Sequence, residues 1–179
     1  MPQPDSQLRI LFSRTQIAER VGALGAQISH DFAGQRVVLI GVLKGAAIFM
    51  SDLARALTID ASFDFVGAAS YGKGSKSSGE VRLTKDFDRT VSGENVILVE
   101  DILDTGLTLS FLKRMLLLHD PKVLRIATLL DKPSRRVQPL KADYTGFTID
   151  DEFVVGYGLD YNEQYRNLAD ICVLDLQAK

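Results

Sequence analysis

The sequence lacks most features that mark secreted and membrane proteins. Its 179 residues include a single cysteine, Cys172, so no internal disulfide can form. Cys172 lies in the apolar run 171–174, where we expect a small core residue rather than a nucleophile. No apolar run approaches the length of a membrane span, and none follows a basic start as in a signal peptide. We therefore expect a soluble cytoplasmic protein with no membrane partner.

A strong excess of either charge is also absent. The formal net charge is −2, with 21 basic and 23 acidic side chains, which favours neither a nucleic-acid partner nor an acidic tail. No internal repeat divides the chain, and its length fits one domain, residues 1–179, with one sizeable core. We therefore expect a single domain that does not bind nucleic acid.

The most informative stretch is residues 96–109, VILVEDILDTGLTL. It begins with an apolar, β-branched run, which is typical of a strand buried on both faces. Glu100 and Asp101 follow, and then come a turn at 104–106 and a helical run at 107–118. Because ligands of open α/β sheets bind beyond the carboxyl ends of strands, we expect a binding site at these acids. The turn can offer N–H groups to an anion at the helix start.

Two other interpretations fit parts of this stretch. In the first, the acids are solvated loop residues of an ordinary strand, loop and helix, and their position beside an apolar strand is accidental. In the second, Asp104, Thr105 and Gly106 form the active-site triplet of an aspartic protease, which needs two aspartates that share a proton. One triplet would require a dimer, and the all-β fold of that family disagrees with the helical run after the turn.

The remaining segments alternate between expected strands and helices. Apolar or β-branched runs indicate strands at 37–42, 59–70, 123–130 and 142–149, and spacing or context indicates helices at 13–30 and 46–57. This order is typical of an α/β fold with a mainly parallel central sheet flanked by helices.

Two loops between these elements suit a ligand. Lys44 and Gly45 stand between a strand and a helix, where a lysine charge and free helix N–H groups suit an anion, although a lone surface lysine is the simpler interpretation. The Gly-Lys-Ser/Thr order of a P-loop is absent. Residues 70–79, SYGKGSKSSG, are either a flexible hairpin loop or a functional lid.

Several of these segments together carry a family resemblance. The stretch 99–109, VEDILDTGLTL, resembles the phosphoribosyl diphosphate (PRPP) motif of type I phosphoribosyltransferases, and in detail that of the hypoxanthine-guanine phosphoribosyltransferases. Further similar segments are LKG at 43–45, SYG at 70–72, DKP at 131–133, VGYGLDY at 155–161 and YRNL at 165–168. The resemblance implies the type I fold with a small hood built from the terminal segments. It also implies Mg²⁺ as the metal and a homodimer or homotetramer.

The same resemblance implies residues for each part of PRPP. Asp104 is the general base at the purine N7, and Leu107 stands where some members of the family have lysine. The 5′-phosphate and ribose site comprises Glu100, Asp101, Asp104, Thr105, Gly106, Leu107 and Thr108. The pyrophosphate site comprises Leu43, Lys44, Gly45 and Arg166, and the Mg²⁺ ligands are Glu100, Asp101 and Asp160. Ser70 and Tyr71 belong to a lid over about 70–80 that excludes water.

The purine site implied by the resemblance distinguishes one class of base. Lys132 donates to the 6-oxo group, whereas adenine would leave its charge unpaired; read alone, 131–136 is a solvated basic turn. Phe153, otherwise a core aromatic, stacks on the purine, with Val154 at the base edge and Asp160 near C2. The expected reaction moves the 5-phosphoribosyl group of PRPP to N9 of hypoxanthine or guanine, giving IMP or GMP and pyrophosphate. The alternative is a regulatory or RNA-binding protein that uses the PRPP motif as a sensor.

Overall fold

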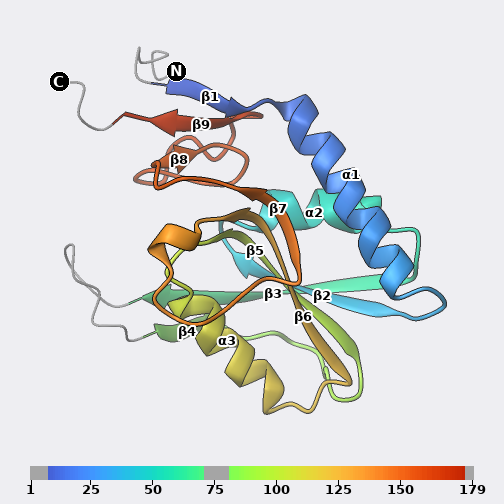
Figure 1. Ribbon diagram of the computed structural model, residues 1–179. Helices are drawn as coiled ribbons and strands as arrows, with labels where there is room; N and C mark the ends of the chain where they lie inside the picture. The colour runs from blue at the N-terminus through green and yellow to red at the C-terminus, as the bar shows by residue number, and fades with distance from the viewer. Residues whose placement is uncertain (1–7, 71–80, 176–179) are drawn as a thin grey trace.

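The computed structural model describes residues 8–70 and 81–175, and Figure 1 shows their arrangement. These residues form two sheets, of which the larger has six strands. In spatial order the six are β4 (Val81–Lys85), β3 (Ala61–Ser70), β2 (Val37–Leu43), β5 (Asn95–Leu103), β6 (Val123–Asp131) and β7 (Tyr144–Thr148). Every neighbouring pair is parallel except β3 and β4. The expected α/β fold with a mainly parallel sheet is confirmed.

The smaller sheet is antiparallel and brings together segments from the two ends of the chain. Its strands are β1 (Leu8–Phe12), β9 (Ile171–Leu174) and β8 (Val154–Val155), in that spatial order. Figure 1 shows this sheet at one end of the molecule, beyond the larger sheet. It is the expected hood. Cys172 is buried within it against Val155 and Leu174, which confirms it as a small core residue.

Helices cover both faces of the larger sheet. On one face α1 (Arg14–Asp31) and α2 (Ala47–Ala56) pack together, and α3 (Leu107–Leu117) covers the other, as Figure 1 shows. A capping box starts α1: the Ser13 hydroxyl accepts from the Gln16 N–H, and the Gln16 side chain accepts from the Ser13 N–H. No helix within the described ranges is long and apolar enough to cross a membrane.

The central strand β5 shows why an apolar run forms the middle of such a sheet. Val96 and Leu98 pack in the cluster under α3, whereas Ile97 and Val99 pack in the cluster under α1 and α2. Successive side chains of a strand point to opposite faces, so a strand covered on both faces needs apolar residues at every position. All four side chains are completely buried, as the sequence predicts.

The expected end of this strand is wrong by several residues. The apolar run suggested that Glu100 and Asp101 follow the strand, but β5 continues to Leu103 because its pairing with β6 continues to the partner Asp131. Both acids are therefore part of the sheet and are only 8% and 9% exposed.

The predicted lid over about 70–80 stays a prediction, since Tyr71 and the following residues to 80 lie outside the described part of the chain.

Candidate active site

Three predicted site residues lie at one edge of the larger sheet. Lys44, Asp104 and Lys132 each directly follow a strand, namely β2, β5 and β6, which are neighbours in the sheet. The helix after β2 covers one face and the helix after β5 covers the other. The gap between the carboxyl ends of β2 and β5 is thus the switch point of the sheet, where ligands of open α/β folds bind.

A pocket of about 310 Å³ occupies this switch point. It is lined by residues 42–45 at the end of β2 and just after it, by 100–106, Thr108 and Leu109 from β5 to α3, and by Ala68, Asp160 and Arg166. The structure therefore brings together every residue predicted for PRPP except Leu107, which does not line the pocket. The Leu107 N–H instead faces the Thr105 hydroxyl oxygen at 3.4 Å.

The turn before α3 opens the helix N-terminus toward this pocket. Gly106 is the N-cap and has a φ of +82°, a conformation that suits glycine. The Thr105 carbonyl oxygen accepts hydrogen bonds from the N–H groups of Val137 (2.9 Å) and Gln138 (3.1 Å), which anchor the turn. Because the first N–H groups of a helix have no partner within it, this arrangement can bind a phosphate group.

Two glycines allow three distant segments to meet beside the acids. A Cβ added to Gly45 would lie 1.7 Å from Asp101 Oδ2, and one added to Gly158 would lie 2.2 Å from the Gly45 carbonyl oxygen. Gly158 also has a φ of +103°. The peptide bond before Lys44 is cis. The loop after β2, the end of β5 and the loop after β8 are thus packed together with no room for side chains at these positions.

Glu100 and Asp101 are a buried pair of carboxylates. Glu100 Oε1 accepts from the Asp101 N–H at 3.3 Å, and Asp101 Oδ1 accepts from the Ile102 N–H at 2.8 Å. Burial, together with the adjacent Asp101 charge, raises the pKa of Glu100 well above its usual value, and burial also raises the pKa of Asp101. Neither forms an ion pair with any described residue. A divalent cation beside them would stabilise their charged forms.

The donor set partly fits Mg²⁺. Carboxylate oxygens are the hard ligands that Mg²⁺ prefers, and Asp101 and Asp160 line the same pocket. However, residues 8–70 and 81–175 contain no group of three or more acidic, histidine or cysteine side chains that could hold a metal alone. Mg²⁺ usually keeps several waters and substrate phosphates as ligands, so one or two carboxylates suffice for it.

Two cations at the rim of this pocket share one carboxylate. The Glu163 side chain accepts from Lys44 Nζ at 2.9 Å and from Arg166 Nη2 at 3.3 Å. Arg166 Nη2 also lies 2.8 Å from Asp160 Oδ1, and its Nη1 donates to the Gly158 carbonyl oxygen at 2.8 Å. The hydrogen bond from Lys44 lowers the pKa of Glu163. The two cations predicted for pyrophosphate thus lie beside one carboxylate, although they stand 122 positions apart in the sequence.

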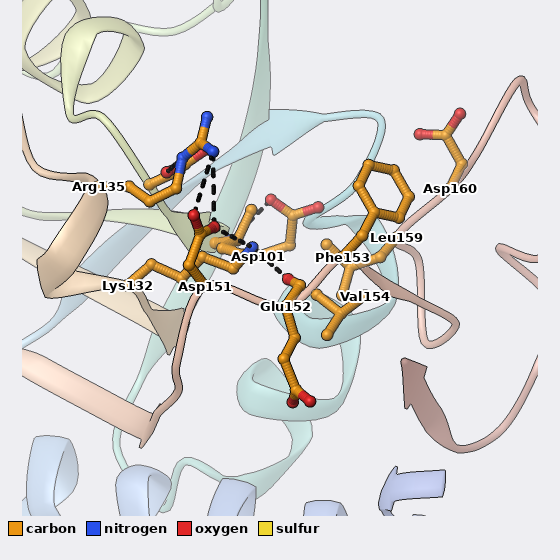
Figure 2. A pocket seen from close by; sticks show the side chains of 11 residues that line it. Asp101, Lys132, Arg135, Asp151, Glu152, Phe153, Val154, Leu159 and Asp160 are labelled. Atoms are coloured by element: carbon orange, nitrogen blue, oxygen red, sulfur yellow. Dashed lines mark hydrogen bonds and ion pairs between the residues drawn. The ribbon is translucent and has the colours of Figure 1, made fainter. Parts of the chain in front are cut away.

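A second pocket, of about 510 Å³, adjoins the first and is shown in Figure 2. The two share Asp101, Ile102, Asp104 and Asp160, and the second is completed by Lys132, Arg135, Asp151, Glu152, Phe153, Val154 and Leu159. All four residues predicted for the purine site line it. It is open to solvent at its rim and large enough for a small heterocycle.

Polar and aromatic groups lie on opposite sides of this second pocket. Lys132 is only 6% exposed, donates a hydrogen bond to the Glu152 carbonyl oxygen and lies 4.0 Å from Asp151 Oδ1. Burial lowers the pKa of Lys132 below its usual 10.5. Phe153 lies across the pocket in Figure 2, is 41% exposed and is therefore not the core aromatic of the simpler interpretation. The solvated basic turn is likewise wrong for Lys132.

Arg135 is a site residue that the sequence reasoning missed. Its Nε donates to Asp104 Oδ1 at 3.1 Å. Its Nη1 lies 3.4 Å from Asp151 Oδ2, as Figure 2 shows for these two residues. The reasoning assigned only Lys132 within the basic run 131–136 and gave no role to the acidic run 150–152. The opposite charges of these two runs were a signal that they could meet beside the base site.

Comparisons with known proteins agree with this geometry. The model of the phosphoribosyl transferase domain family matches residues 10–162. Hypoxanthine-guanine phosphoribosyltransferases of Mycobacterium bovis and Bacillus subtilis are each 46% identical to the chain over 93% of its length, covering 85% and 92% of those proteins. A crystal structure of a hypoxanthine-guanine phosphoribosyltransferase from Bacillus anthracis is 48% identical with a TM-score of 0.89, covering 95% of this chain and 99% of that one.

These matches exclude the aspartic protease interpretation, because the fold they share is the α/β fold described above. The relative from Bacillus subtilis and the structure from Bacillus anthracis match 93% and 95% of the chain. The chain therefore belongs to the phosphoribosyl transferase domain family and, within it, to the hypoxanthine-guanine phosphoribosyltransferases.

Proposed function

We propose that this protein transfers the 5-phosphoribosyl group of PRPP to N9 of hypoxanthine or guanine in purine salvage, giving IMP or GMP and pyrophosphate. The observation that carries the proposal is the pair of adjoining pockets with Asp104 in their common wall. One pocket offers a helix N-terminus and cations to phosphates, and the other offers a buried lysine and an aromatic ring to a base. By its family resemblance the enzyme works in the cytoplasm as a homodimer or homotetramer.

Lys132 is the group that selects the base. The Lys132 ammonium has three donors. The Glu152 carbonyl oxygen and the Asp151 carboxylate lie beside it, which leaves a donor for the base. A 6-oxo group accepts the remaining hydrogen bond, whereas the 6-amino group of adenine leaves this buried donor without an acceptor. Phe153 supplies the stacking surface, Val154 the backbone groups at the base edge, and Asp160 the wall near C2.

PRPP binds along the first pocket. The N–H groups at the start of α3, with the hydroxyls of Thr105 and Thr108, hold the 5′-phosphate. Lys44 and Arg166 bind the pyrophosphate as cations. Glu100 and Asp101 face the ribose hydroxyls and, with Asp160, take part in holding Mg²⁺. When bound, Mg²⁺ supplies positive charge that stabilises the leaving pyrophosphate. Ser70 and Tyr71 remain the predicted lid over both substrates.

Asp104 takes up or hydrogen-bonds the N7 proton of the purine as the new bond to N9 forms. It lies between the two pockets, and the Arg135 guanidinium at 3.1 Å holds its carboxylate in place. Charge stabilisation is the larger part of the catalysis, since each preorganised group at a developing charge contributes about 10²–10³-fold. Lys44 and Arg166 supply such groups at the pyrophosphate.

A steady-state assay with PRPP and Mg²⁺ tests the proposal against hypoxanthine, guanine, xanthine and adenine. We expect turnover of the first two bases and none of adenine. Lys132→Met should abolish most of this turnover, while Lys122→Met, at the opposite edge of the sheet before β6, serves as the matched control. Turnover of adenine by the wild type would contradict the role of Lys132. PRPP binding without turnover of any base would favour a sensor.

A further inference from the structure

Glu163 stands out because its carboxylate lies where an anionic ligand would be expected. Its two oxygens pair separately, Oε2 with Lys44 Nζ at 2.9 Å and Oε1 with Arg166 Nη2 at 3.3 Å. These cations line the PRPP pocket from two separate segments, one from the loop after β2 and one from the segment before β9. A single carboxylate thus joins two cations as one phosphate group of a ligand could.

The backbone around Glu163 is arranged to present this side chain. Asn162, Glu163 and Tyr165 have φ values of +50°, +61° and +73°, which residues other than glycine rarely adopt. The Glu163 N–H donates to Asp160 Oδ2 at 2.8 Å, which fixes the turn. Unusual backbone conformations of this kind persist where the surroundings require them and often accompany function.

The pairing of Glu163 with Lys44 and Arg166 contributes little to the stability of the fold. The side chains of Glu163 and Lys44 are 65% and 66% exposed, and exposed ion pairs are weak and screened by salt. Arg166 keeps other partners without it, namely Asp160 and the Gly158 carbonyl oxygen. The pairing is therefore easily exchanged for a stronger anion at the same cations.

We propose that Glu163 is an internal counter-ion of the pyrophosphate site, which pairs with Lys44 and Arg166 in the free enzyme and is displaced by the pyrophosphate group of PRPP. The inference rests on the proposed function, which gives these two cations to pyrophosphate. Pyrophosphate carries more negative charge than a carboxylate, so it displaces the Glu163 side chain from the two cations. Because Glu163 competes with PRPP and with the product pyrophosphate alike, it weakens both and promotes product release.

Substitution of Glu163 by glutamine removes the competing charge and keeps the size of the side chain. We expect the Kd values of PRPP and of pyrophosphate, measured by isothermal titration calorimetry in one Mg²⁺ buffer, to fall by about two- to fivefold, the range of an exposed ion pair. Glu163→Ala should act in the same direction. An unchanged Kd overturns the proposal, and so does a higher one, which is the result if Glu163 merely holds the two cations in place.

Two controls separate competition from a general change of charge. Glu94→Gln makes the same substitution directly before β5, at the opposite edge of the sheet, and should leave both Kd values unchanged. In a Lys44→Met background, Glu163→Gln should change the Kd less, because one of the competing contacts is already gone. Equal changes in both backgrounds overturn the proposal.

The same titrations separate the inference from the proposed function. If the folded wild-type protein binds neither PRPP nor pyrophosphate, the proposed function fails and the inference fails with it. If the wild type binds both ligands but Glu163→Gln binds them no more tightly, only the inference fails. A thermal unfolding curve of each variant establishes that it is folded before the titration.

Discussion

Glu100→Gln should make the protein more stable while making it a poorer enzyme. Glu100 is 8% exposed, has Asp101 as its neighbour and forms no ion pair with any residue in the described ranges. Its carboxylate therefore carries a desolvation cost and a repulsion, both of which the neutral amide removes. Glutamine keeps an oxygen that can accept from the Asp101 N–H, so the hydrogen bond at 3.3 Å is retained.

The expected gain in unfolding free energy is about 0.5–2 kcal/mol, the range for single stabilising substitutions. For a chain of this size each 1 kcal/mol moves Tm by about 2–4 °C. Denaturant unfolding at neutral pH with a metal chelator present measures the gain. The exposed Glu19→Gln on α1 is the matched control and should change the free energy by less than about 0.5 kcal/mol.

The pH dependence provides an independent check. Since burial raises the pKa of Glu100 in the folded state, the folded chain binds a proton more tightly than the unfolded chain does. Wild-type stability should therefore fall as pH rises from the unfolded pKa of about 4.5 through the higher folded value. Glu100→Gln should flatten this fall, although Asp101, whose pKa is also raised, leaves part of it. Lower stability than wild type, or an unchanged pH slope, would refute the reasoning.

Asp104, Lys132 and Gly158 support further tests. Asp104→Asn should lower kcat by about 10²–10⁴-fold with little change in PRPP affinity; unchanged turnover would exclude a general base. Because burial lowers the pKa of Lys132, the KM for hypoxanthine should rise with pH below 10.5 as the ammonium loses its proton, and a flat KM to that pH would contradict its role. Gly158→Ala, whose Cβ would meet the Gly45 carbonyl oxygen at 2.2 Å, should cost about 1–3 kcal/mol of stability and raise the KM for PRPP. Wild-type behaviour in both assays would show that the contact is dispensable.

Most of the fold could be predicted because its signals are local. The run before Glu100 is apolar at every position, which distinguishes a doubly covered strand, and Ser13, where the helix was expected to begin, is the N-cap of α1. The end of β5 could not be predicted in this way. Glu100 and Asp101 interrupt the apolar pattern, but the hydrogen bonds between β5 and β6 continue past them. These hydrogen bonds depend on the partner strand, which the pattern of β5 alone does not reveal.

The same distinction, between local motifs and contacts of distant residues, decides which parts of the site could be predicted. Asp104, Lys132 and the helix start at Gly106 lie in contiguous motifs, so a resemblance could locate them. No motif located Arg135, because its contact with Asp104 depends on the 3₁₀ turn Pro133–Arg135, and only the opposite charges of the runs 131–136 and 150–152 pointed to it. The contact between Gly45 and Asp101 likewise joins residues distant in sequence, and a motif does not record which distant atoms leave no room for a Cβ.

The common wall of the two pockets has a consequence for ligand design. Asp101, Ile102, Asp104 and Asp160 border both the base pocket and the PRPP pocket, so the two pockets adjoin along these four residues. A heterocycle and an anionic group that each bind weakly could therefore be joined by a short linker. When a linker matches the span between two sites, the second contact becomes intramolecular, and affinity can rise by about 10²–10⁴-fold without any new interaction. The molecule thus offers two adjoining pockets to an inhibitor built from fragments.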